Sequence, residues 1–495
     1  MSGKRITIMA AFLVSVLSAA PVHAAEAPAP VAEQTDYYAV FADGSKIGQS
    51  VETRKVEGGK VTTTNRMEIV AGRGLMEIAV TQEVVSIETD KGRPLGFRSM
   101  QDMSLMSQEV EGAIDSGGML TIVSKTGGGD DTRKMPWPSG AMLTEGLRLY
   151  RLSKGLAAGT TYSGTVFETT SLAPVKFETT VGPRKKINLL GRTVQATETT
   201  TVMSGPTGTV QTVEYLDDQA RTLKSTLHSL GMSLEIISCS KEVAQSENGA
   251  VDFLSKTLLP SPQPLTGLAG ARSATIVLLA TRPGQLNVPT LPNQHVLPGV
   301  NGRLTVNVSA VPVPSGARFP YAGSDPLALA AMKPARYLES DRKEIIDLAR
   351  QAVGNTTDAG EAARRIERFV HGYISTKDLS VGYATAAEAA ASREGDCSEH
   401  AVLAAAMCRA VGIPAQVVAG MAYVPEFQEQ RDVFGPHAWV RAFVGDRWIN
   451  LDPTFPGGWD VAHIALASGD GNPADFLGMV NTLGDFKIAQ VQLRR

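Results

Sequence analysis

The sequence predicts an α+β protein in which a β-rich N-terminal region precedes a C-terminal region with helices. Three observations support this: residues 36–245 are rich in Thr and Val and contain alternating stretches, prolines recur through residues 260–334, and apolar residues take helical spacing after Ser340. At 495 residues the chain is about three times as long as a typical domain. We therefore expect a β-rich domain over 36–245, a Pro-rich β segment and linker over 260–334, and a separate domain over 335–495.

The composition is that of a globular protein. Hydrophobic residues make up 43% of the chain and charged residues 20%. The formal net charge is only −3, and no tract of Lys or Arg is present. This charge distribution gives no electrostatic footprint for nucleic acid, so we expect none as a partner.

The N-terminus has the pattern of a secretory signal peptide. Lys4 and Arg5 precede an apolar run over residues 6–20, and small residues follow at Ala24 and Ala25. We predict that residues 1–24 are removed and that the protein is exported, to the periplasm or the extracellular space. No later stretch has the roughly 20 apolar residues of a membrane helix, so no transmembrane segment is expected in the mature chain.

The region 36–245 is expected to form a large antiparallel meander or curved sheet. Alternating stretches at residues 61–69 and 76–84 are typical of half-buried strands. A helix-like stretch at residues 143–152 interrupts the strands. Turn sequences lie between strand-like runs at hairpin spacing: Asp43-Gly44, Gly58-Gly59 and Gly205-Pro206-Thr207-Gly208.

In the C-terminal half, strand-like stretches at 274–279 and 304–308 precede helical patterns at 341–353 and 358–373. Asp358 and Glu361 have the spacing of a capping box at the start of the second helix.

A reactive cysteine is predicted at the start of a further helix. Asp396 and Glu399 form a second capping box, so Cys397 takes the first helical position, where free N–H groups and the helix dipole should lower the thiol pKa. Gly412 then ends a buried helix over residues 397–411.

The other cysteines do not suit a metal site or a disulfide with Cys397. Cys408 lies 11 residues along the same helix, roughly 16 Å away at about 1.5 Å per residue, so it cannot share a metal with Cys397 and His400. We expect Cys408 to be a core residue, His400 to be structural, and Cys239 to be unpaired. No metal and no cofactor are predicted.

A hairpin supplies a candidate base. With a two-residue turn at Gly445-Asp446, Trp439 lies opposite Asp452, which makes His437 and Asp452 diagonal neighbours on one face. A diagonal of this kind allows an imidazole–carboxylate hydrogen bond. The opposite face is apolar and should pack in the core: Ala438, Val440, Ala442, Val444, Ile449 and Leu451.

Cys397, His437 and Asp452 have the residue types and setting of an activated-thiol triad. At these positions the chain, from about residue 335 to 454, resembles the transglutaminase-like superfamily. The resemblance rests on four segments in the family's order: Gly395-Asp396-Cys397, Gly412-Ile413-Pro414-Ala415, His437-Ala438-Trp439 and Asp452-Pro453-Thr454. It implies a papain-like core in which these three residues are catalytic.

The resemblance also implies amide-bond chemistry through a thioester, with a protein or peptide substrate, possibly of the cell envelope. Hydrolysis is our first hypothesis, because water is the default nucleophile in an aqueous compartment. Two alternatives are a protein-glutamine transamidase, in which Trp439 and Trp448 would wall a tunnel for an amine, and a non-catalytic binding module of the envelope.

Two departures from the family pattern stand out. Gln416 and Arg441 occupy positions where relatives often carry Arg and Glu, so a structural ion pair is predicted to be lost and Arg441 could alter the charge preference for substrate. No calcium-loop pattern is present. His463 and Tyr423 are expected to lie near the motifs only in sequence and to be structural.

Overall fold

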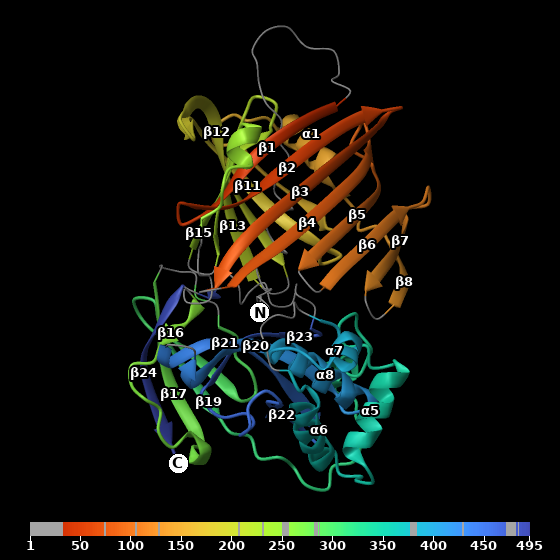
Figure 1. Cartoon of the computed structure of the whole chain (residues 1–495), viewed down its shortest axis with the longest axis vertical. Coiled ribbons are helices and arrows are strands. Elements are labelled where there is room, and N and C mark those ends of the chain that lie inside the picture. Colours follow the sequence, from red (N-terminus) through yellow and green to blue (C-terminus); the bar gives the residue numbers. More distant parts are fainter. Residues whose placement is uncertain are drawn as a thin grey trace. The chain divides into compact units, whose positions relative to one another are not determined.

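A computed structural model describes most of the chain after residue 32 (Figure 1). The described residues are 33–73, 76–103, 106–126, 129–205, 208–229, 232–249, 257–281, 286, 288–376, 384–427, 430–471, 482–483 and 485–495. The predicted signal peptide lies outside them. The chain divides into two compact units, Met1–Phe253 and Leu254–Arg495.

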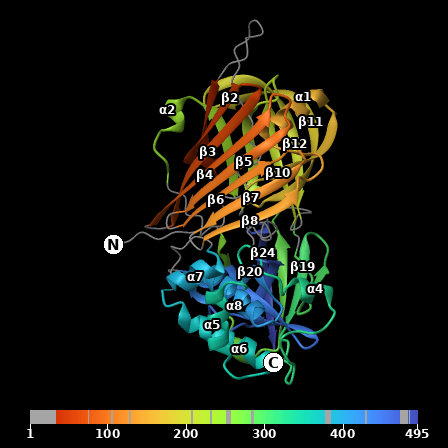
Figure 2. The same cartoon turned by 90° about the vertical axis from the view of Figure 1, so that its right-hand side faces the viewer.

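The first unit is built on one 15-stranded sheet. Strands β1 to β8 follow one another across one half of it, β1 pairs with β15, and the order then runs back to β9. Among the described strands of this sheet, only β9 and β10 pair in parallel. The long strands of the first half lie side by side in Figure 2. The sheet is therefore the meander that the sequence predicts.

The strands of this sheet have the following bounds: β1 (Glu33–Ala42), β2 (Ser45–Glu57), β3 (Lys60–Arg73), β4 (Met76–Thr89), β5 (Pro94–Met103), β6 (Met106–Ile114), β7 (Met119–Thr126), β8 (Gly129–Pro136), β9 (Ala141–Met142), β10 (Thr161–Glu168), β11 (Ala173–Leu189), β12 (Arg192–Gly205), β13 (Gly208–Leu216), β14 (Thr222–Ser229) and β15 (Met232–Cys239). Two helices accompany them: α1 (Thr144–Lys154) and α2 (Lys241–Ala244).

Helix α1 is the helix predicted at residues 143–152, and charged side chains from the sheet hold it. The carboxylate of Glu88 accepts hydrogen bonds from the amides of Glu145 and Gly146, at 2.6 and 2.8 Å, and so caps the helix. At the other end, Arg151 pairs with Glu214 at 2.6 Å, both buried. Because Glu88 lies on β4 and Glu214 on β13, α1 connects the two halves of the sheet.

The second unit contains two sheets and a group of helices. One sheet has the order β16-β21-β20-β23, with β22 paired to β21, and the other has the order β18-β19-β17-β24. The strands are β16 (Leu259–Pro260), β17 (Ser273–Ala280), β18 (Gln294–Pro298), β19 (Arg303–Ser309), β20 (Ala415–Phe427), β21 (Gln430–Val444), β22 (Arg447–Leu451), β23 (His463–Gly469) and β24 (Phe486–Arg494).

Helices α5 to α8 gather beside the sheet that contains β20 and β21 (Figure 1). The helical segments of this unit are η2 (Leu268–Gly270), α4 (Pro326–Ala330), α5 (Lys343–Val353), α6 (Ala359–Tyr373), α7 (Ala386–Ser392) and α8 (Cys397–Ala410). Helices α5, α6 and α8 agree with the predicted helices within two residues. At α6 only half of the predicted capping box forms: Asp358 accepts from the Glu361 amide, but the Glu361 carboxylate pairs with Arg365.

The predicted linker over 260–334 is not a separate segment. Its strands β17 and β19 share a sheet with β24 at the end of the chain, and β16 pairs with β21. The division expected at residue 335 is therefore replaced by one at residue 254. Within the described residues, no helix combines the length and apolar character that crossing a membrane would require.

A glycine allows three strands to approach closely at the centre of the second unit. Gly420 on β20 lies opposite His437 on β21 and Ala465 on β23. A Cβ atom at Gly420 would come within 2.0 Å of the carbonyl oxygen of Ile464. Only glycine fits here without moving β23 away from β20.

We predict that Gly420→Ala lowers the free energy of unfolding by roughly 2 kcal/mol or more, because the added methyl group must displace backbone rather than a flexible side chain. Urea unfolding followed by circular dichroism measures the change. Gly457→Ala is the matched control, since its Cβ would meet no heavy atom within 4 Å. Equal stability of the two variants would contradict the prediction.

Candidate active site

Cys397 begins helix α8, and the predicted capping box is present. The Asp396 carboxylate accepts from the Ser398 amide at 2.7 Å, and the Glu399 carboxylate accepts from the Asp396 amide at 2.9 Å. Cys397 is half-buried, and its sulfur accepts a hydrogen bond from the backbone N–H of Ala438. Since Ala438 directly follows His437, this bond joins the start of α8 to the strand that carries the candidate base.

The predicted lowering of the thiol pKa is wrong for the free protein. Burial raises the pKa of Cys397 well above its usual value, and the negative charges of Asp396, Glu399 and Asp452 raise it further, whereas the hydrogen bond from Ala438 lowers it. The sequence predicts the position of Cys397 at the helix N-terminus, but it does not predict how deeply the sulfur is buried. Cys397 is therefore a neutral thiol at rest.

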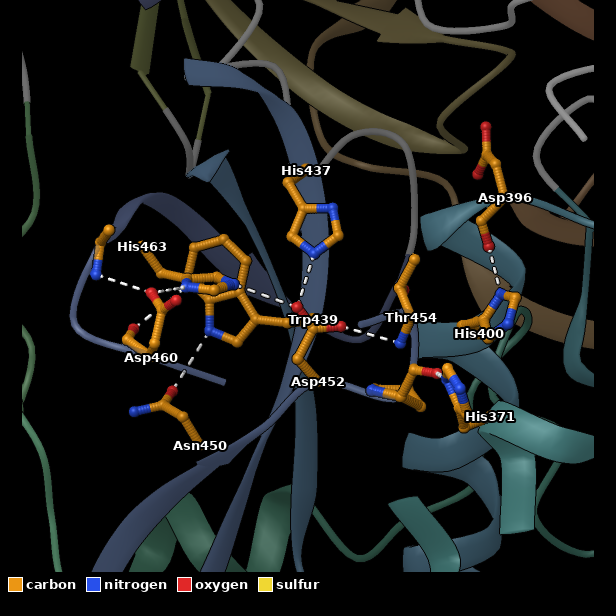
Figure 3. Close-up of polar contacts among 12 residues, drawn as sticks. His371, Asp396, His400, His437, Trp439, Asn450, Asp452, Thr454, Asp460 and His463 are labelled. Atoms are coloured by element: carbon orange, nitrogen blue, oxygen red, sulfur yellow. Dashed lines mark hydrogen bonds and ion pairs between the residues drawn. The ribbon is translucent and has the colours of Figure 1, made fainter. Parts of the chain in front are cut away.

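The hairpin of β21 and β22 has the predicted register. Val444 pairs with Arg447 and Val440 with Leu451. The side chains of His437 and Asp452 meet as expected, with Nε2 of His437 donating to Oδ2 of Asp452 at 2.7 Å (Figure 3). His437 is 8% exposed and Asp452 is fully buried.

Backbone groups and a second acid fix the position of Asp452. Its Oδ1 accepts from the Thr454 amide at 2.8 Å, and its own amide donates to the carboxylate of Glu367 on α6 at 2.7 Å. Burial alone would raise the pKa of Asp452, but the hydrogen bonds and charges of His437 and His463 outweigh burial and hold the pKa well below its usual range. Asp452 is thus a carboxylate throughout the physiological range.

The ring of His437 is held in one plane. It stacks on Phe455, with ring centroids 4.5 Å apart and an interplanar angle of 4°. Because Nε2 donates to Asp452, the lone pair of the neutral ring is on Nδ1. The nitrogen that can accept a proton is therefore the one that does not face the carboxylate.

His463 is a residue of this site that the sequence analysis treats as structural. It opens β23 opposite Ala422, and its Nε2 lies 3.0 Å from Oδ2 of Asp452, the oxygen that His437 also contacts (Figure 3). The expectation that it lies near the motifs only in sequence is therefore wrong. His463 reaches the site because β23 pairs with β20, a contact between segments about 40 residues apart that periodicity does not indicate.

His437, Asp452 and His463 are the described residues whose atoms gather as a metal site would require, within 4.8 Å of one another. Both imidazole nitrogens are directed at one oxygen, however, at hydrogen-bond distances of 2.7 and 3.0 Å. Hydrogen bonds therefore account for the cluster, and its chemistry does not call for a metal.

The remaining candidates are structural, as predicted. Nδ1 of His400 contacts the Asp396 carbonyl oxygen on its own helix at 2.6 Å. Cys408 is completely buried, and burial raises its pKa to about 12. Cys239 lies in the first unit, and all three cysteines are unbridged. The hydroxyl of Tyr423 accepts from the Leu265 amide at 3.1 Å and donates to Asp432.

The two departures from the family pattern compensate each other. Gln416 and Arg441 are cross-strand partners, and Nε of Arg441 donates to Oε1 of Gln416 at 2.9 Å. Arg441 also stacks on Trp448, at 4.7 Å from the ring centroid, and burial lowers its pKa to about 10. Arg441 is only 6% exposed, so it is part of the core and does not set the charge preference for substrate.

We predict that Asp396→Asn shifts the alkylation of Cys397 to lower pH, by about half a pH unit or more, because it removes a negative charge that raises the thiol pKa. Asn caps a helix as well as Asp does, so α8 should persist. Iodoacetamide rates across pH, read by mass spectrometry, test this; the exposed Asp446→Asn is the control. An unchanged profile would contradict the assigned cause.

Comparison with known proteins agrees with this geometry. Residues 346–453 match the family described as the transglutaminase-like superfamily, whose members are usually cysteine-dependent enzymes. No curated protein sequence matches significantly.

Solved structures of low similarity include a proposed cysteine protease from Cytophaga hutchinsonii, 19% identical over 45% of this chain and 85% of that one, with a TM-score of 0.30. A β-barrel-like protein of a domain of unknown function from Brucella abortus is 14% identical over 42% of this chain and 95% of that one, with a TM-score of 0.32. Three residues of the candidate site, Cys397, His437 and Asp452, lie within the residues that match the transglutaminase-like superfamily, 346–453.

Proposed function

We propose that the protein is an exported, cysteine-dependent hydrolase of amide or peptide bonds that works through a thioester. One observation carries the proposal: the Cys397 sulfur accepts a hydrogen bond from the amide of Ala438, the residue after His437, and His437 donates a hydrogen bond to Asp452. In this arrangement Cys397 is the nucleophile, His437 the base and Asp452 the residue that orients the base.

Because Cys397 is a neutral thiol, His437 must act as a general base and remove its proton. Because burial and nearby acids disfavour the thiolate, the thiol must lose its proton as it attacks. The Sγ–H proton passes to Nδ1 of His437 while sulfur bonds to the carbonyl carbon of the substrate. Asp452 accepts the hydrogen bond from Nε2 and stabilises the imidazolium that forms.

The tetrahedral intermediate then needs donors for its oxyanion. In α8 the Asp396 side chain occupies the amides of the second and third helical residues, whereas the Cys397 amide has no partner within the helix. This amide is the candidate donor. When the C–N bond breaks, His437 gives its proton to the leaving amine, and the acyl group remains on Cys397 as a thioester.

Water completes the cycle. It attacks the thioester carbon and gives a proton to His437, and the departing thiolate takes that proton back as the C–S bond breaks. The burial of two tryptophans favours water over an amine acceptor. Trp439 and Trp448, the predicted walls of an amine tunnel, are only 2% and 7% exposed. Trp439 packs with Val418 and Ala465, and Trp448 packs in the cluster of Phe443, so both rings are core residues.

We predict that the purified chain hydrolyses glutamine-containing peptides faster than it transfers them to a tagged primary amine. Cys397→Ala should lower the rate by about 10³-fold or more, because the thioester can no longer form. Chain cleavage, ammonia release and tag incorporation are measured in parallel by mass spectrometry.

Cys408→Ala is the matched control, since it removes a buried thiol from the same helix and should reduce stability while retaining turnover. Tag incorporation that depends on Cys397 and exceeds hydrolysis would favour the transamidase. Tight peptide binding without any turnover would favour the binding module of the cell envelope.

Export is part of the proposal and rests on the basic start and apolar run of residues 4–20. We predict that the mature chain, expressed with its leader in a bacterium with a periplasm, begins at Ala25 or Glu26. Leu13→Arg should block processing by interrupting the apolar run. N-terminal sequencing tests both statements, and an intact Met1 on a secreted chain would refute cleavage.

A further inference from the structure

His463 has a setting that the proposed mechanism does not use. Its ring is 1% exposed and has carboxyl groups on both sides. Nε2 lies 3.0 Å from Oδ2 of Asp452, while Nδ1 lies 3.1 Å from Oδ1 of Asp460 and 3.0 Å from the Asp460 carbonyl oxygen.

This geometry determines the protonation of the ring. A neutral imidazole has one N–H and one lone pair, so a neutral His463 would point a lone pair at an anionic or carbonyl oxygen. Only the imidazolium donates at both nitrogens. Burial acts to lower the pKa of His463, but the hydrogen bonds to Asp452 and Asp460 outweigh it and raise the pKa to about 9.

The other groups around His463 agree with a buried cation. The rings of Trp439, Phe455 and Trp459 pack against it, with centroids 5.1, 5.9 and 5.7 Å away, and the ring of His437 lies 5.5 Å away. Glu367 adds a further negative group on the Asp452 amide. The titratable groups facing His463 are therefore carboxylates, together with His437.

We propose that His463 is a positioning residue: as a permanent imidazolium between Asp452 and Asp460, it fixes the carboxylate on which His437 depends. The role of His463 in catalysis rests on the proposed function, in which His437 is the base. Asp452 divides one oxygen between two donors, so the cation of His463 offsets part of its charge. Asp452 therefore holds Nε2 of His437 by a hydrogen bond, and Nδ1 is the ring nitrogen left to accept the Cys397 proton.

The test compares the full chain with His463→Gln, whose amide can still donate to Asp452 but carries no charge. The ring carbons of all histidines are labelled with ¹³C, and their NMR signals are followed from pH 5 to 10. In the parent, one buried histidine should remain protonated to about pH 9 and should disappear in His463→Gln. The His437 signals of the variant should titrate at a higher pH than in the parent, because a positive charge that opposes protonation of His437 is gone.

His371→Gln is the matched control. This histidine contacts the carbonyl of Pro453, next to Asp452, at 3.0 Å, whereas His437, His463 and the Thr454 amide bind the carboxylate, so its loss should leave the His437 titration in place. If His463→Gln does not fold, Asp460→Asn serves instead. It keeps His463 but removes one carboxylate, so His463 should lose its proton at a lower pH than in the parent.

Two outcomes overturn the proposal: a His463 signal that titrates below pH 7 in the parent, or a His437 titration that is the same in the parent and His463→Gln. In peptide hydrolysis, the acid limb of the pH profile should move up with the His437 titration. A structural role alone would lower the rate without moving that limb. Protonated His463 without any turnover would support this proposal and refute the proposed function, so the two are tested separately.

Discussion

The carboxylate of Asp452 is the group on which the rest of the site depends. Oδ2 accepts from His437 and His463, Oδ1 accepts from the Thr454 amide, and the residue's own amide donates to Glu367. These bonds connect β21, β23 and α6 through one fully buried group. A buried carboxylate is costly unless its oxygens are satisfied, and here both of them are. The same bonds that stabilise the charge therefore orient the base.

Close packing of the strands makes this network possible. β20 lies between β21 and β23, and the lack of a side chain at Gly420 lets β23 approach β20 closely. His437 on β21 lies opposite Gly420, and His463 on β23 lies opposite Ala422. Because the two histidines flank β20 near the same point, they can reach one carboxylate from two directions. Farther along, the cross-strand pair of Gln416 and Arg441 stabilises the pairing of β20 with β21. It does so through a hydrogen bond from Arg441 to the neutral amide of Gln416.

The sequence predicts those parts of the site that depend on local geometry. The capping box at Asp396 places Cys397, and a two-residue turn determines the hairpin register that brings His437 to Asp452. His463 is missed because its strand reaches the site only through pairing with β20. For the same reason the sequence does not indicate that β24 completes the sheet of β17, and so it misplaces the domain boundary. Pairing between distant strands has no local signature.

The state of the thiol shows why a motif does not determine reactivity. The capping box that positions Cys397 consists of two acids, and their carboxyl groups lie beside the sulfur whose ionisation they oppose. The helix terminus favours a thiolate, but burial and these acids outweigh it. A site built in this way must couple loss of the thiol proton to substrate attack, which requires a base that is neutral and correctly turned. A carboxylate shared between His437 and a second, charged histidine provides such a base, and thus the helix cap and the buried cation are two parts of one electrostatic arrangement.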